Sequence, residues 1–136
     1  MNSSSMSKLG SVFVSRVILI LWLISLGLVC YLSLKSKVEY PLDFSGADLL
    51  YHSLAYLWLA FLSSFAFGSQ SRIMLCLFSL ILLGVVLEFC QLFVPGRLFS
   101  VADMGANSLG AILGYVFGAW CKAFLLALFG KERRQT

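Results

Sequence analysis

Four long apolar segments constrain the fold of this chain more than any other feature. They cover about residues 12–34, 47–68, 72–94 and 102–129. Each is long enough to cross the hydrocarbon core of a bilayer as an α-helix, which takes roughly 20 residues. A helix also satisfies its own backbone hydrogen bonds, which a segment inside lipid must do. The sequence therefore predicts an all-α integral membrane bundle of four transmembrane helices.

Composition supports this class and argues against others. Hydrophobic residues make up 60% of the chain and charged residues only 12%, which leaves too little polar surface for a soluble domain. The net charge of +4 does not indicate nucleic-acid binding, because the basic residues are scattered at the ends of apolar segments. The four cysteines lie inside apolar segments and form no CxxC motif. We therefore expect no disulfide framework, no metal centre and no cofactor.

The chain is about the length of one domain. We expect a flexible N-terminus at residues 1–10, a transmembrane domain at 11–130 and a basic C-terminal tail at 131–136. The dipeptide Pro95-Gly96 should end the third helix and reverse the chain, since proline cannot continue a helix and glycine permits a sharp turn.

Lysine and arginine counts predict the orientation of the bundle. Four spans place both termini and the second loop on one side of the membrane. That side holds the larger basic set, which is Lys8, Arg16, Arg72, Lys122, Lys131, Arg133 and Arg134. The opposite side holds Lys35, Lys37 and Arg97. We therefore expect both termini in the cytoplasm and the first and third loops outside.

Polar residues cluster near the outer ends of three predicted helices. Asp48, His52 and Tyr56 are spaced at i, i+4 and i+8, so they share one face of the second helix. Glu88 and Gln91 are spaced at i and i+3 near the end of the third helix. Glu88 lies seven residues before Pro95, or about 10 Å along a helix, which puts it inside the hydrocarbon edge.

The fourth helix adds Asp103 and Asn107 at i and i+4, and Arg97 lies in the turn before it. Polar side chains are costly in lipid, so side chains at one depth should face each other. The candidate pocket comprises Asp48, His52, Tyr56, Glu88, Gln91, Arg97, Asp103 and Asn107.

A structural interpretation of the same residues remains open. Polar groups at helix ends often only bond neighbouring helices. Tyr56 alone is typical of the membrane interface. Ser100 or Asp103 is expected to cap the fourth helix, and Asp103 taken alone is better explained as that N-cap.

Gly110, Gly114 and Gly118 continue the Asp103 and Asn107 face with a small residue every fourth position. This spacing indicates close approach between helix backbones. Because the stripe extends the polar face, we favour packing inside the bundle and leave homo-oligomerisation as the alternative.

Two blocks of these residues resemble a known family. The stretch DLLYHSLAY, with Asp48, His52 and Tyr56, is similar to the D-K-x-x-H-x-x-x-Y signature of VanZ-like membrane proteins. The second block contains, in the family's order and spacing, Glu88, Gln91, Pro95, Gly96, Arg97, Asp103, Asn107, Gly110 and Gly114. Leu49 departs from the signature, which usually has lysine there, so the chain lacks that charge beside Asp48.

The resemblance implies a compact bundle of about four transmembrane helices in the bacterial cytoplasmic membrane. The family is named for an accessory protein that gives low-level resistance to the lipoglycopeptide teicoplanin, so antibiotic resistance applies here only by analogy.

Three functions fit the predicted pocket. The first is an envelope accessory protein that binds a lipid headgroup, a lipid-linked precursor, a glycolipid or a lipoglycopeptide, with Arg97 pairing an anionic group. The second is an enzyme on such a lipid, with His52 as base, Glu88 as acid and aspartates holding a divalent cation. The third is a structural subunit of a membrane complex. The sequence favours the first, because it has no nucleophile motif and no phosphate-binding glycine loop.

Overall fold

The computed structural model describes residues 3–36 and 46–132. They form four helices, which are α1 (Ser3–Leu34), α2 (Ala47–Ala66), α3 (Gln70–Gln91) and α4 (Val101–Glu132). Every helix contains a stretch that is apolar and long enough to cross a membrane. The prediction of an all-α bundle with four transmembrane helices is thereby confirmed.

Helix bounds differ from the predicted spans at several ends. Helix α1 begins at Ser3, so residues 3–10, expected to be flexible, extend the apolar helix, since adding a turn to a formed helix costs far less than nucleating one. Helix α3 begins at Gln70, where Ser69 caps it by accepting a hydrogen bond from the Arg72 amide at 3.4 Å. Residues 1–2 and 133–136, with Arg133 and Arg134, and 37–45, with Lys37, lie outside the described residues.

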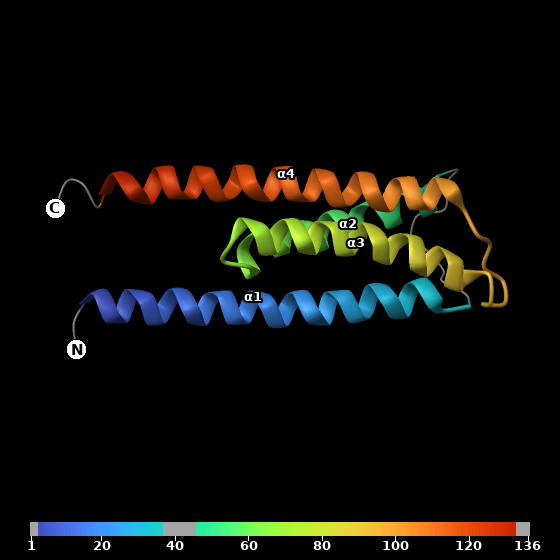
Figure 1. The fold of residues 1–136 in the computed structure, drawn as a ribbon, viewed down its shortest axis with the longest axis horizontal. Coiled ribbons are helices and arrows are strands. Elements are labelled where there is room, and N and C mark those ends of the chain that lie inside the picture. Colours follow the sequence, from blue (N-terminus) through green and yellow to red (C-terminus); the bar gives the residue numbers. More distant parts are fainter. Residues whose placement is uncertain (1–2, 37–45, 133–136) are drawn as a thin grey trace.

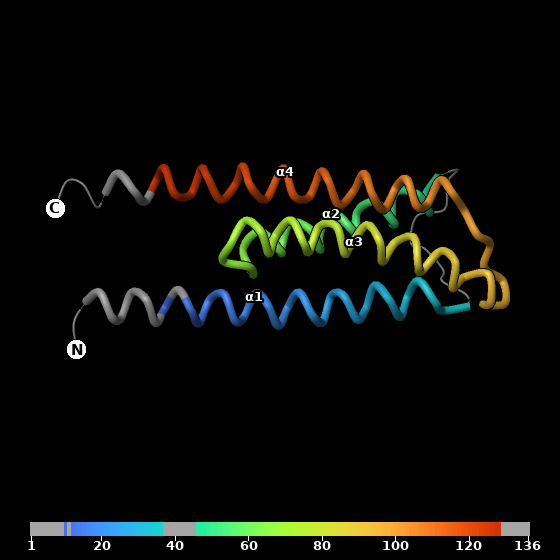
Figure 2. The backbone as a smooth tube through the Cα atoms, viewed as in Figure 1, coloured from blue at the N-terminus to red at the C-terminus, as the bar shows by residue number. Residues whose placement is uncertain are grey.

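The α2–α3 hairpin lies between α1 and α4, and both chain termini lie at the same end of the bundle (Figure 1). The α3–α4 connection lies at the other end (Figure 2). We call this other end the site end; there α1 and α3 finish and α2 and α4 begin. Helices α2 and α4 therefore run parallel, with their N-termini side by side at the site end.

Helix α2 is the centre of the bundle and contacts the other three helices. Its residues Tyr56, Leu59 and Ala60 are almost fully buried. Helix α1 packs against α2 partly through indole hydrogen bonds, since Trp22 Nε1 donates to the Leu59 carbonyl at 3.0 Å. The outer faces of the helices carry many exposed large apolar side chains, which is what a surface facing lipid requires.

The closest helix packing in the bundle joins α4 to α2. A Cβ atom added at Gly110 would overlap the carbonyl of Ser53, and one added at Gly114 would overlap that of Leu57. At Gly118 the added atom would meet Ser64 Oγ at 2.6 Å. The glycine stripe thus packs inside the bundle and brings the α4 backbone directly onto α2.

Candidate functional site

A tight turn between α3 and α4 positions the first polar side chain of the site end. The Arg97 amide donates to the Val94 carbonyl at 3.1 Å, and Gly96 has φ of 81°. Proline followed by a glycine with positive φ is the pattern of a type II turn. The sharp reversal expected at Pro95-Gly96 is therefore present, and it brings Arg97 back beside the end of α1.

Arg97 and Gln91 donate hydrogen bonds to carbonyls in the last turn of α1 and directly after it. Arg97 Nε donates to the Lys35 carbonyl at 3.1 Å, and Arg97 Nη2 donates to that of Leu32 at 2.9 Å. Gln91 Nε2 donates to the Ser33 carbonyl at 3.0 Å. The final carbonyls of a helix have no partner within the helix, so these side chains cap α1 and attach it to α3. No sequence pattern identifies these acceptors, because any residue supplies a carbonyl.

Ser100 caps α4, and the expectation that Asp103 is the N-cap is wrong. The Asp103 amide donates to Ser100 Oγ at 3.1 Å, as at a standard serine N-cap. Asp103 instead lies within the first turn of α4. Its carboxylate interacts with the Ser100 side chain at its own helix end and also faces His52 on α2.

Glu88 links this cap to α3. The Ser100 amide donates to Glu88 Oε2 at 3.2 Å, and Glu88 is 0% exposed. The other carboxylate oxygen, Oε1, is buried and has no hydrogen-bond partner among the described residues. The Tyr56 hydroxyl is likewise buried and has no hydrogen-bond partner among the described residues. Among the described residues, Asp48 Oδ1 and, near the far end of α2, Ser64 Oγ are the other two such atoms, so three of the four lie in or next to this region, where polar atoms without partners are unusual.

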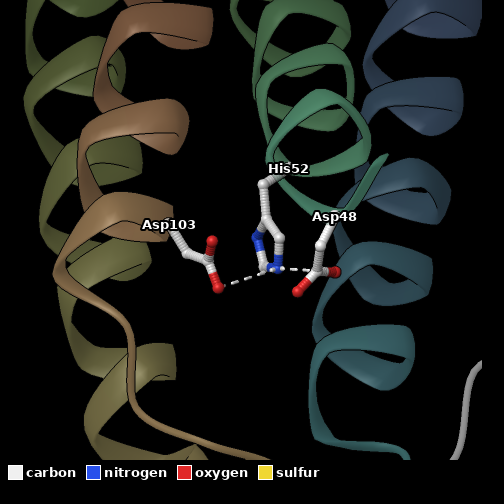
Figure 3. Close-up of side chains that lie close together, drawn as sticks. All are labelled: Asp48, His52 and Asp103. Carbon is white, nitrogen blue, oxygen red and sulfur yellow. Dashed lines mark ion pairs between the residues drawn. The ribbon is translucent and has the colours of Figure 1, made fainter. Parts of the chain in front are cut away.

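Three side chains from α2 and α4 surround a common point at the site end. His52 Nε2 lies 3.8 Å from Asp48 Oδ1 and 3.9 Å from Asp103 Oδ2. Figure 3 shows the imidazole ring between the two carboxylates. Both distances exceed hydrogen-bond length. We call Asp48, His52 and Asp103 the Asp-His-Asp cluster.

Asn107 fixes the orientation of the histidine ring. Its Oδ1 atom lies 3.1 Å from His52 Nδ1. An amide oxygen only accepts, so Nδ1 carries the proton and donates to it. In the neutral ring, Nε2 then has a lone pair directed toward the two aspartates.

Exposure falls steadily from the surface into the bundle along this site. The Asp48 side chain is 48% exposed, whereas those of His52 and Asp103 are 9% and 8% exposed. Asn107 is 2% exposed. Gly84 makes room for this inner part, since a Cβ atom there would lie 3.1 Å from Asn107 Cβ. Polar side chains thus extend from the half-exposed Asp48 at the surface of the site end to the buried Asn107.

A separate cleft lies between α1 and α3 and is almost entirely apolar. Its volume is about 350 Å³, and its lining includes Trp22, Leu26, Leu75, Leu80 and the charged residue Arg72. Hydrocarbon chains of the surrounding bilayer suit such a lining. It shares no lining residue with the Asp-His-Asp cluster.

The fold and the site together define a multi-pass membrane protein with a bundle of four spanning helices and a buried polar cluster at one end. The chain matches the VanZ/LLP1 family over residues 5–125. It therefore belongs to that family, as the resemblance of the two sequence blocks predicts. Searches of curated proteins and of solved structures found no match.

Proposed function

We propose that this protein is an envelope accessory protein whose site end binds the polar headgroup of a lipid or lipoglycopeptide. The observation that carries the proposal is the convergence of Asp48, His52 and Asp103 from two helices, with Asp48 half-exposed and the other two buried. Ionisable side chains at such a depth are costly and typically mark a functional site.

The chemistry of the cluster narrows the class of headgroup. Asp48, Asp103 and Glu88 contribute carboxylates, and His52 and Asn107 contribute one ring and one amide. Gln91 and Arg97 direct donors to α1, so they contribute less to ligand binding than the sequence suggests. Carboxylates accept hydrogen bonds from hydroxyl and ammonium groups. A headgroup with sugar hydroxyls or an amine, which glycolipids and lipoglycopeptides share, fits this site best.

Orientation toward the outside of the bacterial cytoplasmic membrane belongs to the same proposal. Arg72 and Lys122 lie toward the end with the termini, where Lys122 Nζ donates to the Ser64 carbonyl near the end of α2 at 3.0 Å. Arg97 and Lys35 lie at the site end. The excess of basic residues near the termini supports a cytoplasmic location for both termini, which would turn the cluster outward.

Native mass spectrometry tests the proposal with lipids added to purified protein. The probes are a glycolipid with a free amine and, for comparison, phosphatidylcholine. We expect the protein to retain the glycolipid preferentially, and Asp103→Asn to reduce that retention by roughly tenfold or more, because a lost charge-assisted hydrogen bond is worth roughly 1.5–3 kcal/mol. Glu132→Gln removes a carboxylate at the opposite end of α4 and serves as the matched control. Equal retention of both lipids by wild type and Asp103→Asn would contradict headgroup binding.

A further inference from the structure

We propose that the Asp-His-Asp cluster is a binding site for one divalent cation of the zinc type. Asp48, His52 and Asp103 each offer one ligand atom, and these atoms all lie within 4.8 Å of one another. The cysteine pattern predicted no metal centre, and only the enzyme alternative placed a divalent cation on aspartates, without His52 as a ligand. Headgroup binding alone does not require a cation at this cluster.

The distances between the ligand atoms suit a shared cation better than direct bonds. Zn²⁺ is bound at about 2.0–2.2 Å by histidine nitrogen and carboxylate oxygen, so two ligands at a tetrahedral angle lie roughly 3.4 Å apart. The observed separations from His52 Nε2 are 3.8 Å and 3.9 Å. A movement of each carboxylate by a few tenths of an ångström toward His52 would close this difference.

The ring nitrogen of His52 that would not bind the metal already has a hydrogen-bond partner. A metal-binding histidine commonly donates its other ring N–H to a carbonyl or carboxylate, which fixes the tautomer. His52 Nδ1 has this partner in Asn107 Oδ1 at 3.1 Å. The ring therefore presents the Nε2 lone pair to the point between the two aspartates, as a ligand must.

The charge around this point also favours a cation. Asp48 and Asp103 face the histidine from α2 and α4, and Glu88 on α3 interacts electrostatically with all three cluster residues. Glu88 is 0% exposed and its Oε1 atom has no hydrogen-bond partner among the described residues. Arg97 interacts electrostatically with Asp103 but directs two donors to α1. Carboxylates this close together in a weakly polar interior stay ionised only where positive charge compensates them and otherwise take up protons; a bound cation would supply that charge.

The ligand types indicate which cations fit. Imidazole suits Zn²⁺ and related transition metals, whereas all-oxygen sites suit Mg²⁺ and Ca²⁺. Three protein ligands leave one position of a tetrahedral zinc site open. An oxygen atom of a bound headgroup would complete it; this last role rests on the proposed function, whereas cation binding does not.

Metal binding by the purified protein tests the inference directly. The protein is purified in detergent through a tag without histidine, treated with chelator, and titrated with Zn²⁺ by calorimetry. Bound zinc is counted by elemental mass spectrometry. Co²⁺ replaces Zn²⁺ in a parallel titration, because its visible absorption reports coordination geometry. We expect one ion per chain and a tetrahedral Co²⁺ spectrum.

Variants distinguish this site from adventitious binding. His52→Gln and Asp103→Asn should each weaken Zn²⁺ binding more than tenfold, and Asn107→Leu about tenfold or more through the ring orientation. Glu132→Gln is the matched control and should bind as wild type does. If a buried variant fails to fold, as judged by gel filtration and circular dichroism, Asp48→Asn provides the same test at a half-exposed position.

Two results would overturn the inference. One is the absence of stoichiometric binding to wild type. The other is unchanged affinity in a folded Asp48→Asn or His52→Gln protein. Neither result would affect glycolipid retention in the absence of metal, so failure of the cation site and failure of headgroup binding are distinguishable.

Discussion

Individual polar side chains at the site end divide into two groups by what they contact. Gln91 and Arg97 complete the hydrogen bonding of a neighbouring helix end. Asp48, His52 and Asp103 contact each other without forming direct hydrogen bonds. The first group joins neighbouring helices, and the second group carries the proposed headgroup and cation sites.

Glu88 belongs partly to both groups, because one carboxylate oxygen accepts from the Ser100 amide and the other has no partner among the described residues. Replacing it tests how much the hydrogen bond to Ser100 stabilises the protein. Glu88→Ala should destabilise the protein by about 2 kcal/mol, because it leaves the Ser100 amide without its acceptor and creates a cavity. Glu88→Gln keeps an acceptor oxygen and should cost less than half as much. Thermal unfolding in detergent, followed by circular dichroism, measures both. Equal loss in the two variants would show that the hydrogen bond to Ser100 contributes little.

Residue positions were more predictable than residue contacts. The periodicity of Asp48 and His52 and of Asp103 and Asn107 indicated which faces they share, and the structure brings these four residues to one site. The N-cap of α4 was ambiguous because Ser100 and Asp103 are both good capping residues. Contacts of Gln91 and Arg97 with α1 carbonyls depend on how α1 packs, which a sequence pattern does not encode.

The packing of α4 against α2 depends on the glycine stripe of α4. Gly110 and Gly114 lie directly against the carbonyls of Ser53 and Leu57 on α2. This contact sets the distance between the two helices that carry the Asp-His-Asp cluster. Packing and site geometry are therefore coupled through the α2–α4 interface.

Gly114→Ala tests that coupling with a single added methyl group. The new Cβ atom would overlap the Leu57 carbonyl, so the helices must separate, at a cost of about 1–3 kcal/mol. The matched control is Gly105→Ala, since a Cβ atom at Gly105 has no neighbour within 4 Å. The control should be neutral or stabilising by up to about 1 kcal/mol through helix propensity. Thermal unfolding of both variants checks this, and a control as unstable as Gly114→Ala would contradict it.

Arg97 holds the end of α1 against the rest of the bundle through its hydrogen bonds. Arg97→Gln removes the donors to the Leu32 and Lys35 carbonyls, so the end of α1 should open more often. Hydrogen exchange measured by mass spectrometry should become about tenfold faster in residues 32–36, as expected for the loss of roughly 1.4 kcal/mol of local stability. Lys122→Gln is the matched control, since Lys122 donates to α2 at the other end. Exchange at residues 32–36 that does not change in Arg97→Gln would refute the capping role.

The whole molecule places both termini at one end and the polar cluster at the other (Figure 1). Length and hydropathy were sufficient to predict four spans, because apolar runs of this length have few other stable structures in lipid. The exact ends were less predictable: α3 ends at Gln91 rather than near residue 94, since the chain forms turns before Pro95.

Orientation in the membrane is testable with single cysteines in a variant that lacks Cys30, Cys76, Cys90 and Cys121. Leu98→Cys lies at the site end, where Leu98 is 86% exposed. Gly68→Cys lies in the turn at the opposite end. In intact bacterial cells a membrane-impermeant maleimide should label position 98 and reach position 68 only after permeabilisation. The reverse pattern would turn the site toward the cytoplasm.

The account depends above all on the convergence of α2 and α4 side chains at the site end. Dibromobimane measures this most directly, because it fluoresces strongly only after joining two nearby thiols. In the cysteine-free background, Asp48→Cys combined with Asp103→Cys should give strong fluorescence, since their carboxylates lie on either side of His52. Asp48→Cys combined with Gly105→Cys, on another face of α4, should give little. Fluorescence of the second pair equal to or above that of the first would contradict the site.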